Sequence, residues 1–226
     1  GHHRDDILQI EAIFMGQAGL LELNTIPERY QKDALNDGYF AKLRNEYKYL
    51  AHKFNLTPMD YRQWRFLRLR PQNFPHIRIS QLAHLYYQRK AGLSQLVEAA
   101  SVEDAKKVLA TAVTPYWETH YTFGSTSVRN DKNLSPFSLN LLCINTVVPI
   151  LFAYGRHRGE EKYCDRAFDF LEQLRPENNY IIRLWQQCGL VVDNAGDSQA
   201  LIQLKKEYCD KKECLRCRFG YEYLKL

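Results

Sequence analysis

Apolar residues recur every three or four positions along most of this sequence, a spacing that is typical of amphipathic α-helices. One such stripe is formed by Ile7, Ile10, Phe14 and Ala18, and others are expected in residues 37–53, 101–112 and 159–176, in a helix that resumes after Pro75, and in a helix that runs from about residue 197 to the cysteine cluster. No two runs of alternating apolar and polar residues flank a hairpin turn. The sequence therefore predicts an all-α fold, a single irregular bundle of about seven to nine helices.

The most apolar part of the chain, residues 139–155, is also predicted to be a helix. Pro136 suits the first turn of that helix, because the missing N–H of proline is not needed there. Asn145 and Pro149 interrupt the apolar run and are expected to bend the helix. We therefore expect a buried helix and no segment of the roughly 20 apolar residues that cross a membrane.

Length and cysteine content suggest one domain in a reducing compartment. The chain has 226 residues, of which 45% are hydrophobic, and this composition predicts one globular domain over residues 1–226. Six cysteines are too few for a disulfide scaffold, and no secretory signal is evident, so we expect a cytoplasmic protein. Because the sequence begins with glycine, we expect a fragment of a longer protein.

Positive charge is concentrated in one part of the chain. The net charge is +5, yet residues 61–97 contain seven Lys and Arg and no Asp or Glu. Such segregation indicates an acidic partner, which we expect to be nucleic acid or another polyanion. Prolines at 71 and 75 would hold the side chains of this stretch in a fixed arrangement. The predicted anion-binding residues are Arg68, Arg70, Asn73 and Arg78.

The same stretch has a second interpretation. Trp64 and Phe66 could stack on bases beside the arginines, or they could belong to the core together with Leu67 and Leu69. In the second case each arginine would pair with an acid elsewhere, such as Glu11 at the edge of the first apolar stripe. The chain would then be a purely structural interaction domain.

Residues 122–135 are predicted to form a loop that carries small hydroxyl residues and the cations Arg129 and Lys132. Such a loop before a helix can hold an anion. A solvated loop is the simpler interpretation, because the spacing of a P-loop is absent.

Three cysteines lie close together near the C-terminus, in CDKKECLRC (209–217). Thiolates spaced C-x2-C can chelate zinc or an iron–sulfur cluster, so Cys209, Cys214 and Cys217 are candidate metal ligands with an unknown fourth ligand. Neighbouring cations would lower the pKa of these thiols: Lys211, Lys212, Arg216 and Arg218. Alternatively, this is a helix C-terminus, where basic residues suit the helix dipole and cysteines pack as small apolar groups.

No catalytic motif is recognisable, so the catalytic residues are unknown and the sequence does not decide whether the chain is an enzyme. The leading hypothesis is a helical accessory or binding module with a basic surface for an anionic partner. The first alternative is part of a hydrolase with a cysteine-ligated structural metal. The second is the purely structural interaction domain.

Four stretches together resemble one known family: IEAIFMGQAGLLE (10–22), LRPQNFPHIRISQLA (69–83), INTVVPILFAYG (144–155) and DSQALIQLKKEYCDKKECLRCRFGYEYL (197–224). The family is catalogued as domain of unknown function 2851, and its members occur chiefly in Bacteroidetes. The resemblance implies a bacterial protein without an assigned activity. Family members are longer and have a preceding strand-rich region with histidine and acidic motifs. The resemblance therefore implies a C-terminal part that works beside a preceding domain.

Overall fold

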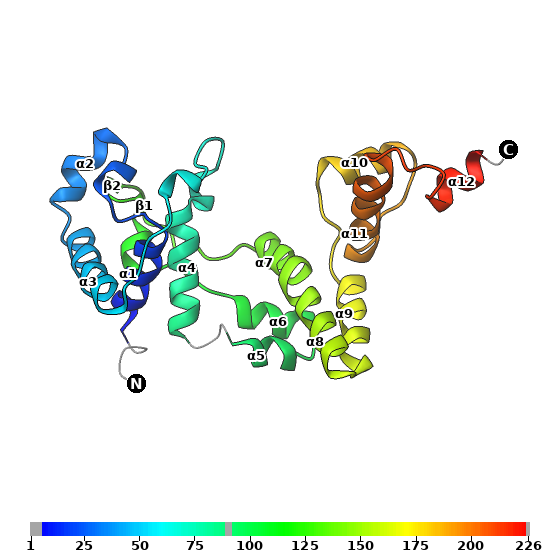
Figure 1. Cartoon of the computed structure of the whole chain (residues 1–226), viewed down its shortest axis with the longest axis horizontal. Helices are drawn as coiled ribbons and strands as arrows, with labels where there is room; N and C mark the ends of the chain where they lie inside the picture. Colours follow the sequence, from blue (N-terminus) through cyan, green and yellow to red (C-terminus); the bar gives the residue numbers. More distant parts are fainter. Residues whose placement is uncertain (1–5, 89–91, 225–226) are drawn as a thin grey trace. The chain divides into compact units, whose positions relative to one another are not determined.

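The computed structural model describes residues 6–88 and 92–224 and groups the chain into two compact units (Figure 1). Unit 1 comprises Gly1–Gly92 and Val108–Ser135, and unit 2 comprises Leu93–Lys107 and Pro136–Leu226. Each unit is described by itself below. The single domain expected over residues 1–226 stays a prediction.

Helices make up most of both units, which confirms the all-α prediction. In unit 1 the helices are α1 (Ile7–Gln17), α2 (Glu28–Leu35), α3 (Gly38–Phe54) and α4 (Pro75–Tyr87). In unit 2 they are α5 (Leu93–Glu98), α6 (Val102–Leu109, of which the last two residues fall in unit 1), α7 (Pro136–Leu142), α8 (Val148–Arg158), α9 (Glu161–Gln173), α10 (Tyr180–Gln187), α11 (Ala195–Leu204) and α12 (Arg218–Leu224).

Several short elements were not expected from the sequence. Helices α2, α5 and α12 have 8, 6 and 7 residues, which is too short for an apolar stripe to repeat. Strands β1 (His120–Thr122) and β2 (Ser125–Thr126) form an antiparallel hairpin at the start of the predicted loop. Strands of three and two residues are too short to show alternation, so the hairpin left no pattern in the sequence.

Local side-chain contacts explain where several helices begin. The Asp6 carboxylate accepts a hydrogen bond from the N–H of Leu8 at 2.9 Å, and this caps α1. Asp37 caps α3 by accepting from the N–H of Tyr39 at 2.8 Å. Helix α4 starts at Pro75, where the sequence predicts that a helix resumes.

The core of unit 1 forms where α1 packs on α3 and α4. The sequence predicts that Ile79, Leu82, Ala83 and Tyr86 of α4 face the core, and this is only partly right, because Leu82 and Tyr86 are 50% and 44% exposed. Besides His76, two polar residues are buried on this helix instead. Gln81 donates to the carbonyl of Lys132 at 2.6 Å, and Ser80 accepts from the N–H of Thr114 at 3.1 Å. Burial of these polar groups is possible because each has a hydrogen-bond partner.

One carboxyl group, Glu11, lies inside this core with none of its surface exposed. Its oxygens accept hydrogen bonds from the Tyr39 hydroxyl (2.5 Å), the Thr114 hydroxyl (3.0 Å) and the indole N–H of Trp117 (2.5 Å). A single side chain thus joins α1 to α3 and to the segment that follows α6. No arginine among the described residues pairs with Glu11, so that part of the structural interpretation is wrong.

The uncharged surroundings of Glu11 affect its ionisation. Burial raises the pKa of Glu11 above its ordinary value, and the hydrogen bonds from Tyr39, Thr114, Ser80 and Trp117 offset part of that rise because they favour the charged form. A carboxyl group with a raised pKa binds its proton more tightly in the folded than in the unfolded protein. Its contribution to stability is therefore largest at low pH and is lost as the pH rises through the folded-state pKa.

In unit 2, α7 and α8 form one continuous helix through a π-helical turn, Cys143–Val147. The turn lies just before Pro149, and the Asn145 side chain donates to the carbonyl of Leu141 at 2.9 Å. The predicted irregularity at Asn145 and Pro149 is therefore present, in the form of a wider turn.

The combined helix, Pro136–Arg158, is longer than the sequence suggested. It has 23 residues, and an 18-residue window of it has a mean hydropathy of 1.7, so by length and composition it could cross a membrane. The expectation that no apolar segment reaches this length is wrong. A core helix of a soluble protein can meet the same criteria. Here Cys143, Val147 and Leu151 are fully buried, but only 28% of the apolar window is buried, so the prediction of a buried helix is only partly right.

The hydrogen bonds around buried Glu11 lead to a prediction about how the stability of the protein changes with pH. Relative to the wild type, Glu11→Gln should gain stability as the pH rises from about 4 to about 8, because only the wild type must ionise a buried carboxyl. The glutamine carbonyl can still accept from Trp117, and its amide can donate to the hydroxyls of Tyr39 and Thr114. Urea unfolding followed by tryptophan fluorescence at several pH values measures the difference.

Glu28→Gln is the matched control, because it removes an exposed carboxylate from the same unit. Glu11→Ala should lose about 3 kcal/mol or more at every pH, since it leaves buried donors without an acceptor. A Glu11→Gln variant that loses stability relative to the wild type as the pH rises would contradict the raised pKa.

Candidate functional site: an arginine segment beside an aromatic groove

Residues 62–70, which we call the arginine segment, form a loop near the N-terminal end of α4 (Figure 1). Arg65, Arg68 and Arg70 are exposed, and no Asp or Glu among the described residues forms an ion pair with them. Arg62 differs, because it pairs with Asp60 at 2.8 Å. Three cations of the segment therefore keep uncompensated charge at the surface. Arg89 and Lys90 of the same acid-free stretch lie outside the described residues.

The other two predicted anion-binding residues contact each other. The guanidinium of half-buried Arg78 donates to the side-chain oxygens of Asn73 (2.6 Å) and Gln81 (2.9 Å). Burial lowers the pKa of Arg78 somewhat, but arginine remains charged in proteins. Both partners are neutral, so they do not compensate the positive charge of Arg78. The two hydrogen bonds hold its guanidinium group in a fixed position.

Arg68 has an unusual backbone conformation. Its φ is 65°, in the left-handed region that residues other than glycine rarely adopt. The N–H of Leu69 donates to the carbonyl of Phe66 at 3.1 Å and closes a tight turn with Arg68 in its third position. A positive φ at that position is typical of a type II turn, which usually has glycine there. An arginine side chain is thus held on the turn at a cost in backbone energy.

The interpretation that the apolar residues of this stretch belong to the core is right for Trp64 and Phe66. It is wrong for Leu67 and Leu69. Trp64 and Phe66 are half-buried, and the Trp64 indole donates to the carbonyl of Ala18 at 2.8 Å. Leu67 and Leu69 are 85% and 40% exposed. The unpaired arginines also lie at the surface and not against buried acceptors.

A groove of about 690 Å³, which we call the aromatic groove, lies next to the arginine segment. It is lined by residues 24–31, by Phe66, Pro71, Phe74 and His76, and by hairpin residues that include Tyr121. Phe66 directly follows Arg65, and Pro71 directly follows Arg70. Both ends of the exposed loop therefore begin in the wall of the groove.

Buried His76 forms part of the groove lining. Only 2% of its surface is exposed, and this burial lowers its pKa to about 3, so the ring is neutral at physiological pH. The ring lies 5.8, 5.5 and 5.4 Å from the ring centres of Phe66, Trp117 and Phe123. Neither ring nitrogen has a hydrogen-bond partner among the described residues. His76 is thus a buried aromatic ring with an unused donor and an unused acceptor.

A glycine holds the hairpin against α2 and so brings two walls of the groove together. A Cβ at Gly124 would lie 2.4 Å from the carbonyl oxygen of Tyr30, and Gly124 has a φ of 72°. Only glycine fits at this position, because it has no Cβ atom and adopts a positive φ without strain. The guanidinium of Arg29 lies 4.6 Å from the centre of the Tyr30 ring, a cation–π distance.

The sequence did not identify His76, Tyr30 or Tyr121 as site residues. They come from three separate parts of the chain, and no spacing pattern connects them. One signal was available for His76. It precedes Ser80 and Ala83 by four and seven residues, so it shares the buried face of α4 with them.

The predicted anion loop, residues 122–135, uses its cations internally. Lys132 is only 4% exposed, and its ammonium donates to the backbone carbonyls of Trp117, Glu118 (3.0 Å) and His120 (3.1 Å). Arg129 forms an ion pair with Glu118 at 2.7 Å. Lys132 is therefore neither solvated nor available to an external anion.

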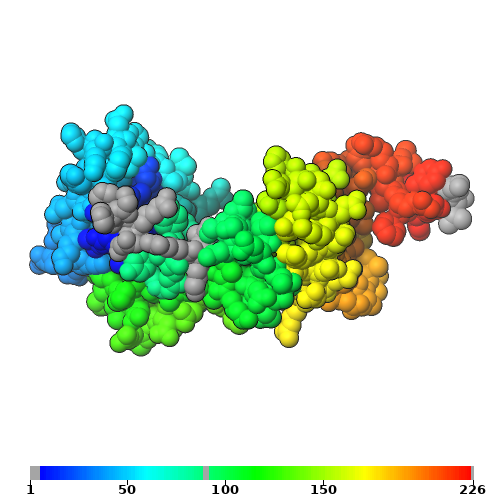
Figure 2. Space-filling view, turned by 90° about the horizontal axis from the view of Figure 1, so that it is seen from below, coloured from blue at the N-terminus to red at the C-terminus, as the bar shows by residue number. Residues whose placement is uncertain are grey.

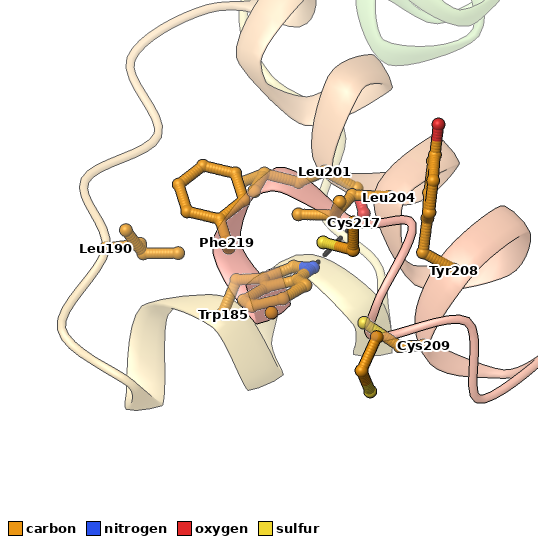
Figure 3. Close-up of a pocket in the computed structure, with 10 residues that line it drawn as sticks. Trp185, Leu190, Leu201, Leu204, Tyr208, Cys209, Cys217 and Phe219 are labelled. Carbon is orange, nitrogen blue, oxygen red and sulfur yellow. Dashed lines mark hydrogen bonds between the residues drawn. The ribbon is translucent and has the colours of Figure 1, made fainter. Parts of the chain in front are cut away.

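In unit 2, the three cysteines of CDKKECLRC line one apolar pocket of about 290 Å³ (Figure 3). The indole of Trp185 donates to the carbonyl of Leu201 at 3.1 Å and fixes one wall. Further walls come from Leu190, Leu204, Tyr208 and Phe219. Cys217 is buried, whereas Cys209 and Cys214 are exposed.

The thiols do not have the electrostatic environment that the sequence suggested. Burial, more than any neighbouring charge, raises the pKa of Cys209, so the expected lowering is wrong for this thiol. Three of the nearby cations pair with acids close in sequence: Lys211 with Glu207, Arg216 with Glu213 and Arg218 with Glu222. In the described part of the chain, no three His, Cys, Asp or Glu form a group that could hold a metal. Zinc or an iron–sulfur cluster at Cys209, Cys214 and Cys217 stays a prediction.

The segment that carries these cysteines lies at the surface. Residues 205–224 are red in the space-filling view and form an outer part of unit 2 (Figure 2). Leu215, Phe219 and Tyr223 are 74%, 72% and 78% exposed. Within residues 205–224 Cys217 is the one buried side chain, so it is the main anchor of this segment.

Cys217→Ser should therefore lower stability by about 1–2 kcal/mol, because it places a hydroxyl in an apolar pocket. Cys188→Ser is the control, since Cys188 is exposed. Thermal unfolding before and after chelator treatment tests whether packing alone explains the loss. Bound zinc in the wild type, with a fall in melting temperature when it is removed, would instead support the metal site.

Comparison with known proteins places the chain in a family. The model of the family described as "Protein of unknown function (DUF2851)" matches residues 1–180, which include all of unit 1 and unit 2 as far as the start of α10. Three of the four stretches that carry the resemblance lie within this match. The fourth, residues 197–224, lies outside it, so the match covers the N-terminal region of the chain and not the cysteine segment. No curated protein and no solved structure matches the chain. The chain belongs to the family of proteins of unknown function DUF2851.

Proposed function

We propose that unit 1 is a binding module for an anionic partner, that this partner is nucleic acid, and that the arginine segment makes the principal contacts. The observation that carries the proposal is the exposure of Arg65, Arg68 and Arg70 without a carboxylate partner in the described residues. Guanidinium groups match phosphate oxygens in geometry and can bind them through two parallel hydrogen bonds.

The surrounding sequence strengthens the charge of this surface. Residues 61–97 contain no Asp or Glu, so the nearest preceding acid is Asp60, which pairs with Arg62 and leaves the other arginines of the segment uncompensated. Arg78 adds a fixed positive charge, and Asn73 holds it in place through its side-chain oxygen. The amide group of Asn73 remains a donor that a phosphate oxygen can accept. Arg68, Arg70, Asn73 and Arg78 thus form a consistent phosphate-binding set.

The left-handed conformation of Arg68 also supports a functional role. Backbone strain at a residue other than glycine is commonly found at binding and catalytic sites, where the side chain is needed. A glycine at position 68 would relieve the strain but would carry no charge.

Replacing all three unpaired arginines (Arg65→Gln, Arg68→Gln and Arg70→Gln together) should weaken nucleic-acid binding at least tenfold at about 50 mM salt, because phosphate binding dominates affinity there. The slope of log affinity against log salt should become shallower by about two to three, because the variant neutralises up to three fewer phosphates and releases fewer counterions. Fluorescence anisotropy with labelled DNA and RNA at several salt concentrations measures both quantities.

The matched control replaces three exposed lysines of the same unit, Lys32, Lys42 and Lys48, with glutamine. It removes the same charge and should change affinity by less than about threefold, since bulk charge acts weakly beyond the Debye length, which is about 14 Å at about 50 mM salt. Absence of binding to any DNA or RNA at low salt would refute the proposed function. Equal losses in the two triple variants would show that net charge and not the segment is responsible.

The Arg68→Gly variant tests the effects of Arg68 on stability and on nucleic-acid binding separately. The variant should be more stable than the wild type by about 0.5–1 kcal/mol, because glycine adopts a positive φ without strain. Its affinity for nucleic acid should nevertheless fall, since glycine has no side chain to bind a phosphate. Urea unfolding and anisotropy on the same preparation test both parts. A loss of stability together with unchanged binding would contradict the role of Arg68.

A further inference from the structure

We infer that the aromatic groove takes an unpaired base of single-stranded nucleic acid, while the arginine segment holds the adjoining phosphates. This inference rests on the proposed function and adds the form of nucleic acid that the unit prefers. It follows from the position, the size and the chemistry of the groove.

The position connects the groove to the cations. Phe66 and Pro71 line the groove, and the exposed loop that carries Arg68 and Arg70 runs between them. Consecutive Cα atoms are about 3.8 Å apart, so the Cα atom of Arg70 lies about 3.8 Å from that of Pro71, and the Cα atom of Arg68 lies at most about 7.6 Å from that of Phe66. In a nucleotide the base and its phosphate are joined through one sugar. A base inside the groove would therefore bring its own phosphate to the rim.

The size of the groove suits a small planar ligand. Its volume of about 690 Å³ lies within the range of roughly 300–1,000 Å³ that is usual for small-molecule sites. Its walls contain the half-buried rings of Tyr30, Phe66, Phe74 and Tyr121. Phe66 and Phe74 meet edge to face, with ring centres 5.5 Å apart. Half-exposed rings of this kind are the surfaces on which bases of single strands stack.

The polar groups of the groove fit an uncharged heteroaromatic ring. His76 is neutral, and its two buried nitrogens are one donor and one acceptor that no described residue uses, so a base edge would reach them only after a small shift of the groove lining. A base edge carries both donors and acceptors, whereas a hydrocarbon ring carries neither. Among the described residues, Glu28 is the one acid that lines the groove, and Arg29, which also lines it, has the opposite charge. In a duplex the bases are stacked and paired, so only a single strand offers a base to such a groove without an energetic penalty.

The test uses the whole chain and three labelled probes of equal length: a thymidine single strand, an abasic single strand with the same number of phosphates, and a duplex. The wild type should bind the thymidine strand at least tenfold more tightly than the abasic strand, which is the effect of about one stacked base. Phe74→Leu should reduce this ratio to about threefold or less. Phe54→Leu, an exposed aromatic residue outside the groove, should leave the ratio unchanged.

Tyr30→Leu provides a second variant, because Tyr30 lies on another wall of the groove and its replacement does not alter the start of α4. It should reduce the same ratio. Equal affinity of the wild type for the thymidine and abasic strands would overturn the inference but leave the proposed function intact. Tighter binding to the duplex would also overturn it. Absence of binding to all three probes would refute the proposed function and this inference together.

Discussion

The buried carboxyl group of Glu11 is the contact on which the architecture of unit 1 depends. Its hydrogen-bond partners, Tyr39, Thr114 and Trp117, are 28 to 106 residues away in the chain, so each bond closes a long loop. A carboxyl without a cation is costly to bury, and three good donors make its burial tolerable. Among the described residues these donors have no other carboxyl partner, so Glu11 and its neighbours depend on one another. Removal of Glu11 would leave α1, α3 and the segment around residue 114 without their common partner.

The Glu11 network also supports the groove. Tyr39 stacks on Tyr116 with ring centres 4.3 Å apart, and Tyr116 stacks on His120 at 4.0 Å, where the hairpin begins. Trp117, which donates to Glu11, lies 5.5 Å from His76 at the groove lining. The aromatic residues that line the groove are therefore attached to the most buried polar contact of the unit. A site supported in this way is preorganised, and ordering it on binding costs little entropy.

Particular residues show which features of the fold and of the candidate site could be predicted from the sequence. Apolar periodicity identified the long helices, and Pro75 marked the start of α4, because these signals are local. The exposure of Arg68 and Arg70 agrees with the absence of acids nearby in sequence. Glu11 was expected to pair with arginine, but its actual partners depend on which distant segments meet. The groove was not foreseen for the same reason, since residues 24–31, His76 and Tyr121 come together only in the folded chain.

Two parts of this chain are both rich in Lys and Arg, but they differ in how far nearby acids compensate their positive charge. Around CDKKECLRC, cations pair with acids within five residues, as Lys205 does with Asp210 and Arg218 with Glu222. Exposed pairs of this kind contribute little stability, but they cancel the field that a partner or a thiol would experience. In the arginine segment Arg62 has such a partner, Asp60, but Arg65, Arg68 and Arg70 have none among the described residues and keep uncompensated charge at the surface. Uncompensated charge lowers stability through repulsion and steers oppositely charged molecules toward the surface. A strained arginine at the tip of such a segment is consistent with selection for a partner, because folding alone would favour glycine there.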